Sequence, residues 1–272
     1  MMYQFADVNG TKIHYEERGE GKAIVLTHAG IVNMGMWDAQ MEAFAQRHRV
    51  VRYDFRGWGE SAQVPGEYSY HEDLRGLLTH LGIEQAAIVG CSWGGKVGLD
   101  FALVYPEMVT ALVLVGTGLG GYKFTMAGIG EKMEAIGGAY QQGDKALMAE
   151  LITQIWFDGL RRTPEQVDAT PRTQVYEMAL HMVSLPEIEG SHVLELDPPA
   201  IERLTEIAKP TLLLVGQEDV EDIFTIAKLL EATLPMAEAL TIIADTAHLP
   251  NMERPSHFNR LVLDFLERIG KA

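Results

Sequence analysis

The sequence predicts an α/β protein in which helices flank a mostly parallel sheet of eight strands, with a helical insertion after the sixth strand. Two observations support this class. Apolar runs of strand length alternate with segments whose apolar residues recur at helical spacing, an order typical of parallel strands joined by crossover helices. The alternation stops after Val115 and resumes at Lys209, and the roughly 90 residues between are far too many for a loop.

The first two expected strands, residues 3–8 and 12–17, form a hairpin. Asn9-Gly10 joins them, a dipeptide that favours a tight turn. The other strands are mostly apolar runs, as is typical of strands buried on both faces of a sheet. They span 23–27, 49–54, 86–90, 109–115, 211–215 and 240–244.

The expected core helices carry apolar residues three and four positions apart, which places these residues on one face. They span 36–46, 70–81, 93–105, 222–232 and 256–269.

The insertion carries helix signals throughout. Thr163 is a good N-cap, followed by Pro164 at the first helical position and Gln166 three residues after the cap. Asp197-Pro198 indicates the start of another helix. We therefore expect an entirely helical cap over the sheet. The expected division is 1–118 and 209–272 for the core and 119–208 for the cap.

Composition narrows the class of protein. A hydrophobic fraction of 47% and a charged fraction of 22% are ordinary for a globular protein. The net charge of −16 disfavours nucleic acid and anionic membranes as partners. There is no apolar run of about 18 residues and no signal-like N-terminus, so we expect a cytoplasmic protein with no membrane partner. The oligomeric state stays open.

Gly90-Cys91-Ser92-Trp93-Gly94 separates the strand at 86–90 from the helix at 93–105. In a strand–turn–helix context, G-x-S-x-G is typical of a nucleophile elbow, where small residues permit a strained turn that exposes the serine. Ser92 is the predicted nucleophile. The alternative, Cys91, would put Val89 and Trp93 where the elbow needs small residues, and the steric argument disfavours it.

A serine hydroxyl needs a base, and that base needs an orienting acid. In open α/β sheets these groups follow the carboxyl ends of strands. Asp219 follows the strand at 211–215, and His248 follows the strand at 240–244. We predict His248 as the base and Asp219 as the acid, with Glu218 and Asp222 as rivals for the acid.

The predicted chemistry also needs two donors for an oxyanion. One is the backbone N–H of Trp93, at the start of a helix, and the other should come from the loop after Thr27, for which Gly30 is the candidate. His28 lies in the same loop. We interpret His28 as a structural residue that braces the loop.

These segments together make the whole chain resemble a capped member of the α/β-hydrolase family. In that family a loop beginning His-Gly-x reaches a tryptophan nine residues later, and His28-Ala29-Gly30 precedes Trp37 at that distance, with alanine in place of the glycine. Residues 54–61 match the family's D-x-R-G-x-G-x-S loop, and Glu253-Arg254-Pro255 follows the base. By this resemblance, Gly30 matches the oxyanion residue.

The resemblance also narrows the reaction. Family members that open epoxides or remove halide use an aspartate where this chain has Ser92, and the His-Gly-Gly-Pro-Gly loop of prolyl aminopeptidases is missing. The chain most resembles small-molecule esterases and enol-lactonases. We expect hydrolysis of a carboxylic ester or lactone, with no cofactor and no metal. Two alternatives stay open: carbon–carbon bond hydrolysis or perhydrolysis with the same triad, and a ligand-binding or receptor protein on this fold.

The sequence leaves the substrate pocket undecided. Apolar residues of the insertion, Trp156 and Phe157 among them, could line an acyl pocket or belong to a core. Four cationic residues of the insertion could contact a carboxylated lactone or face solvent. They are Lys123, Arg161, Arg162 and Arg172.

Overall fold

The sheet of the computed structural model, which describes residues 4–271, has eight strands. They are β1 (Gln4–Val8), β2 (Thr11–Arg18), β3 (Ala23–Thr27), β4 (Arg49–Tyr53), β6 (Ala86–Cys91), β7 (Val109–Val115), β9 (Thr211–Gly216) and β10 (Thr241–Ile243). Their order is β1-β2-β4-β3-β6-β7-β9-β10. β2 pairs antiparallel with β1 and β4, and all other pairs are parallel. The predicted fold class is confirmed; Tyr3 of the first predicted strand lies outside the described residues.

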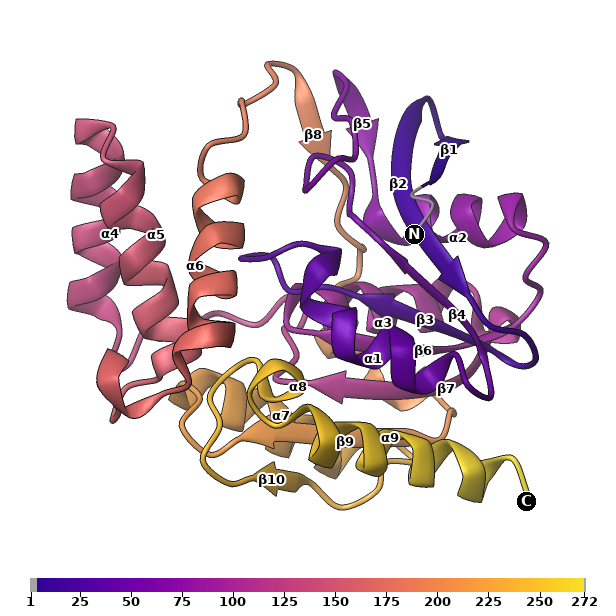
Figure 1. Ribbon diagram of the computed structural model, residues 1–272. Helices are drawn as coiled ribbons and strands as arrows, with labels where there is room; N and C mark the ends of the chain where they lie inside the picture. Colours follow the sequence, from indigo (N-terminus) through magenta and orange to yellow (C-terminus); the bar gives the residue numbers. More distant parts are fainter. Residues whose placement is uncertain (1–3, 272) are drawn as a thin grey trace.

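Helices cover both faces of this sheet (Figure 1). They are α1 (Asp38–Phe44), α2 (Tyr70–His80), α3 (Trp93–Val104), α7 (Glu221–Thr233), α8 (Pro250–Glu253) and α9 (Pro255–Ile269). One apolar cluster joins α2, α3 and α7 to the sheet through residues such as Leu74, Phe101 and Ile226. A second joins α1 and α9 through Phe44 and Phe258. Both faces of the central strands are therefore buried, which explains their apolar sequences.

The insertion between β7 and β9 is mainly helical. It contains α4 (Gly130–Gln142), α5 (Lys145–Thr153), a π-helical turn (Gln154–Asp158) and α6 (Ala169–Met182). Figure 1 shows α4, α5 and α6 side by side at one end of the sheet. Ala149 and Ile152 of α5 pack on Ala179 of α6, so these helices share a small apolar core of their own.

The expectation of an entirely helical insertion is wrong. β8 (Ser191–Val193) pairs in parallel with β5 (Gly66–Tyr68) in a two-stranded sheet. Three residues are too few to show a strand pattern, and the partner strand lies more than 100 residues earlier in the chain. Only long-range hydrogen bonds define this strand, and local sequence does not report them.

At two predicted helix starts in the insertion, the structure has only short 3-10 turns. Thr163 does form a capping box, but its 3-10 helix ends at Gln166, and α6 begins after a different N-cap, Asp168. After Asp197-Pro198 only two 3-10 turns follow, Ala200–Glu202 and Leu204–Glu206. Pro199 explains this, because a proline disfavours helical backbone at the residue before it.

Nothing in residues 4–271 resembles a membrane-spanning helix, since no helix there has both the length and the apolar character required.

Candidate active site

Ser92 lies in a strained turn between β6 and α3. Its φ of 54° and ψ of −115° are unusual for a residue with a side chain. The turn leaves no room beside it: a Cβ on Gly94 would lie 2.1 Å from the carbonyl oxygen of Thr27, and one on Gly90 would lie 2.5 Å from that of Gly94. Only glycine fits at these two positions. The local geometry is that expected of a nucleophile elbow.

The loop after β7 holds the backbone of Ser92 from one side. The Ser92 N–H donates to the carbonyl of Val115 at 2.9 Å, and the Gly118 N–H donates to the carbonyl of Ser92 at 2.9 Å. These two bonds fix the serine relative to residues 115–118.

His248, in the loop after β10, and Asp219, in the loop after β9, form a buried pair. Nδ1 of His248 is 2.8 Å from Oδ2 of Asp219, and the two side chains are 2% and 0% exposed. The second oxygen of Asp219 accepts the backbone N–H of Val220 at 2.8 Å. Because a carboxylate only accepts, Nδ1 of His248 donates and Nε2 is left as a proton acceptor. This is the arrangement that a general base requires.

Gly116 is a site residue that sequence reasoning did not single out. A Cβ there would lie 3.0 Å from both Oδ2 of Asp219 and Nδ1 of His248, and its φ is +47°. The loop at Gly116 therefore touches the acid–base pair, while Val115 and Gly118 hold Ser92. A glycine directly after an apolar strand was the available signal.

We predict that Gly116→Ala lowers both stability and turnover. A side chain at this φ costs about 1–2 kcal/mol, and its Cβ would push the Asp219–His248 pair apart. Urea unfolding and ester turnover measure the two effects. Gly118→Ala is the matched control, because its Cβ meets the Ser92 carbonyl at an ordinary 3.5 Å. Equal activity in the two variants would contradict this role for Gly116.

The rival acids are engaged elsewhere. Glu218 pairs with Arg161 at 2.7 Å. Asp222 accepts bonds from the Tyr122 hydroxyl and from Thr125, where the insertion begins. Burial alone would raise the pKa of Asp222, but these bonds hold its pKa below the ordinary value. Of the three acids considered, Asp219 is the one that contacts His248.

Cys91 is completely buried at the end of β6. Burial, with the nearby Asp219 carboxylate, raises the pKa of its thiol well above the ordinary value. The thiol therefore stays protonated, and its sulfur lies 3.5 Å from the carbonyl oxygen of His248. Its role is to pack beneath the elbow.

Gly30 and Trp93, the predicted oxyanion residues, lie side by side. A Cβ on Gly30 would be 3.5 Å from Cβ of Trp93. The indole N–H of Trp58 donates to the carbonyl of Gly30 at 2.9 Å and so fixes the loop. The N–H of Trp93 belongs to the first turn of α3, where a helix supplies no internal acceptor. Gly30 thus lies beside Trp93, the residue that directly follows Ser92.

His28 braces the loop that carries Gly30. Its Nε2 accepts the N–H of Phe55 at 3.0 Å, and its Nδ1 lies 2.8 Å from the carbonyl of Ala29. These partners require a neutral ring with the proton on Nδ1. Complete burial lowers the pKa of His28, which favours the same neutral form.

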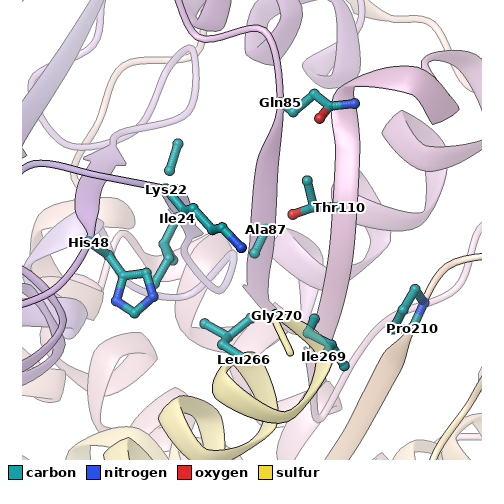
Figure 2. A pocket seen from close by; sticks show the side chains of 11 residues that line it. Lys22, Ile24, His48, Gln85, Ala87, Thr110, Pro210, Leu266, Ile269 and Gly270 are labelled. Atoms are coloured by element: carbon teal, nitrogen blue, oxygen red, sulfur yellow. The ribbon is translucent and has the colours of Figure 1, made fainter. Parts of the chain in front are cut away.

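A cavity of about 360 Å³ lies at the end of the sheet opposite to the predicted site residues. Figure 2 shows Ile24 and Ala87 lining it, with Lys22 and His48 at one side and Leu266 of α9 below. Ile24 and Ala87 belong to the amino-terminal halves of β3 and β6, whereas the predicted site residues follow the carboxyl ends of the strands. This cavity is therefore separate from the candidate active site.

The family is shown by comparison with known proteins. A model of the α/β hydrolase fold family matches residues 22–255, so the chain belongs to that family and the resemblance is confirmed. The chain is 30% identical to the 2-hydroxy-6-oxononadienedioate/2-hydroxy-6-oxononatrienedioate hydrolase of Paraburkholderia phymatum over 268 residues, 94% of this chain and 91% of that protein.

Two solved structures are also similar. Est816, described as an N-acyl homoserine lactone degrading enzyme, is 27% identical with a TM-score of 0.74, covering 96% of this chain and all of that one. The enol-lactonase of Burkholderia xenovorans LB400 shares the fold at 24% identity and a TM-score of 0.75, covering 97% of this chain and all of that one. The family and its members support a hydrolase, in agreement with the enzymatic rather than the receptor interpretation.

Proposed function

We propose that this hydrolase cleaves a carboxylic ester or lactone of a small molecule through an acyl-enzyme on Ser92. One observation carries the proposal: the loop at 115–118 contacts the strained Ser92 and the buried Asp219–His248 pair at once. This arrangement of Ser92, His248 and Asp219, past the carboxyl ends of the strands, supports their roles as nucleophile, base and orienting acid.

The reaction follows from these positions. Ser92 attacks the carbonyl carbon while His248 takes the hydroxyl proton, and Asp219 stabilises the imidazolium. The backbone N–H groups of Gly30 and Trp93 stabilise the oxyanion. As the intermediate collapses, the proton passes from His248 to the leaving alkoxide, which departs as an alcohol or stays tethered if the substrate is a lactone. Water, activated by His248, then releases the acid from Ser92.

The arginines of the insertion favour a substrate without a carboxylate. Arg161 pairs with Glu218 at 2.7 Å, and Arg162 pairs with Glu253 at 2.8 Å. Arg172 pairs with Asp158 at 2.9 Å and with Glu150 at 2.6 Å. A carboxylated substrate that used Arg162 or Arg172 would have to compete with carboxylate partners that are largely buried, and diverting one partner of a buried pair is costly.

Lysines of this region fit the same picture. Lys96, one turn after the elbow, pairs with Asp100 at 3.0 Å and with Glu195. Lys123 is exposed, where water solvates its charge. The two carboxylate partners of Lys96 support a neutral ester or lactone.

Carbon–carbon bond hydrolysis is the second candidate, favoured by the relative from Paraburkholderia phymatum, whose name describes a dicarboxylate substrate. A carbanion is a much poorer leaving group than an alkoxide. Cleavage of a carbon–carbon bond therefore also requires that a proton be added to the leaving carbon. The paired arginines favour the ester over this reaction.

The experiment compares p-nitrophenyl butyrate and a medium-chain N-acyl homoserine lactone with a 2-hydroxy-6-oxo-dienoate. We expect kcat/KM for the ester or the lactone to exceed that for the dienoate by at least about tenfold, a difference of about 1.4 kcal/mol in transition-state binding. Ser92→Ala provides the background rate. The reverse ranking would make carbon–carbon hydrolysis the function.

A further inference from the structure

A segment of the insertion, residues 154–162, packs directly on the loop that carries His248. The carbonyl of Trp156 accepts the His248 backbone N–H at 3.2 Å. Its indole lies against the imidazole with ring centroids 4.5 Å apart and an angle of 48°. Gly159 is in equally close contact: a Cβ there would lie 2.7 Å from the carbonyl of Glu218 and 3.3 Å from Cβ of Ala247. The segment therefore packs against both Glu218, which precedes the acid, and Ala247, which precedes the base.

Arg162 fastens this segment at its end. Its Nε donates to the carbonyl of Asp158 at 2.7 Å, and its Nη2 donates to the carbonyl of Phe157 at 2.8 Å. Both carbonyls belong to the π-helical turn that carries Trp156. The planar guanidinium holds its donors in a fixed fork, so these bonds orient the rest of the group.

The other edge of the guanidinium contacts the His248 loop. Nη1 of Arg162 donates to the carbonyl of Asp245 at 2.9 Å and lies 2.8 Å from Oε2 of Glu253. Asp245 has a φ of 56°, a conformation uncommon for residues other than glycine, and so depends on its surroundings. Arg162 therefore bonds both to the π-helical turn that contacts His248 and to the loop that carries His248.

Glu253 carries the connection to the residue before His248. Its Oε1 accepts the N–H of Ala247 at 2.6 Å, and its side chain is 6% exposed. Burial raises the pKa of Glu253, while the charge of Arg162 opposes that rise. The Arg162 guanidinium therefore stabilises the buried carboxylate of Glu253. Through Glu253 it is linked to Ala247, the residue before His248.

We infer that Arg162 is a positioning residue for His248: it clamps the turn that packs on the imidazole to the loop that carries the imidazole. The inference rests on the proposed function, since it takes His248 as the base. The insertion then has a second task beside any role in substrate binding, because it holds the base at its working distance from Ser92. Arg161, which is 67% exposed on its side chain, and Arg172, which bonds the side chain of Asp158, lack these contacts.

The test compares Arg162→Met and Arg162→Lys with Arg203→Met, which breaks another arginine–carboxylate pair of the insertion, that with Glu206. We expect Arg162→Met to lower kcat by about 10- to 100-fold with KM changed less than about twofold, because a misplaced base slows the chemical step. Arg162→Lys should recover part of the loss through its charge on Glu253. Arg203→Met should keep wild-type kcat. Unchanged kcat in Arg162→Met would overturn the inference.

A double-mutant cycle separates positioning from a general structural effect. In a His248→Ala background, Arg162→Met should lower the residual rate by less than about twofold, because the group it positions is gone. An equal fold-loss in both backgrounds would overturn the inference. If Arg162→Met does not fold, Arg162→Lys and Glu253→Gln carry the same cycle.

Labelling of Ser92 by a fluorophosphonate distinguishes the two levels of failure. If the wild-type protein is not labelled, the proposed function fails and this inference fails with it. If the wild-type protein is labelled and Arg162→Met reacts at the same rate, the inference alone fails.

Discussion

Ser92→Ala should lower kcat for ester hydrolysis by about 10⁶-fold, to the level that binding and the oxyanion donors alone provide. The loss is chemical rather than structural. Serine and alanine share the Cβ that the strained backbone must accommodate, so the turn is no more strained in the variant than in the native protein. Steady-state release of p-nitrophenol measures kcat, and thermal unfolding should show a Tm within a few degrees of wild type.

Cys91→Ala is the matched control for Ser92→Ala. The thiol is buried and protonated, so its loss should cost some packing and leave turnover within about tenfold of wild type. A Ser92→Ala protein that keeps more than about 1% of wild-type turnover would contradict the assignment of the nucleophile. A Cys91→Ala loss of similar size to that expected for Ser92→Ala would point to the cysteine instead.

Asp219→Asn should lower kcat by about 10⁴-fold with the fold intact. The asparagine amide can donate to Nδ1 of His248, which favours the tautomer with the proton on Nε2, the atom that must accept the proton of Ser92. The two side chains have nearly the same shape, so the buried site needs no repacking. Turnover and Tm are measured together, and only turnover should fall.

Glu218→Gln tests the neighbouring carboxylate. It removes the pair with Arg161, whose side chain is largely exposed, so we expect kcat to stay within about tenfold of wild type. If Asp219→Asn lowers kcat by less than about tenfold and Glu218→Gln lowers it by more, Glu218 is the acid and the assignment of Asp219 is wrong.

The sheet could be predicted because most of its central strands are apolar and buried on both faces. β3 and β7 match their predicted bounds, and most other core elements differ by one or two residues. The candidate site was predictable for a related reason. Ser92, Asp219 and His248 each follow the carboxyl end of a parallel strand, and the structure brings the last two into contact.

The insertion was less predictable, because its structure depends on contacts between distant segments. β8 exists through its pairing with β5, and no local pattern announces three exposed or half-buried residues as a strand. The arginines are a similar case. The sequence could not decide whether Arg162 faces substrate or solvent. In the structure its guanidinium bonds to the carbonyl of Asp245 and pairs with Glu253. Gly116 was visible only as a glycine after a strand until its neighbours were known.

The central claim is that Ser92 is the nucleophile of a working hydrolase. Its most direct test is mass spectrometry of the protein after a fluorophosphonate probe, first intact and then as peptides, with Ser92→Ala as control. We predict one adduct per chain, located on Ser92, that is lost in Ser92→Ala. No adduct on the folded wild-type protein, or an adduct on another residue that persists in Ser92→Ala, would contradict the claim.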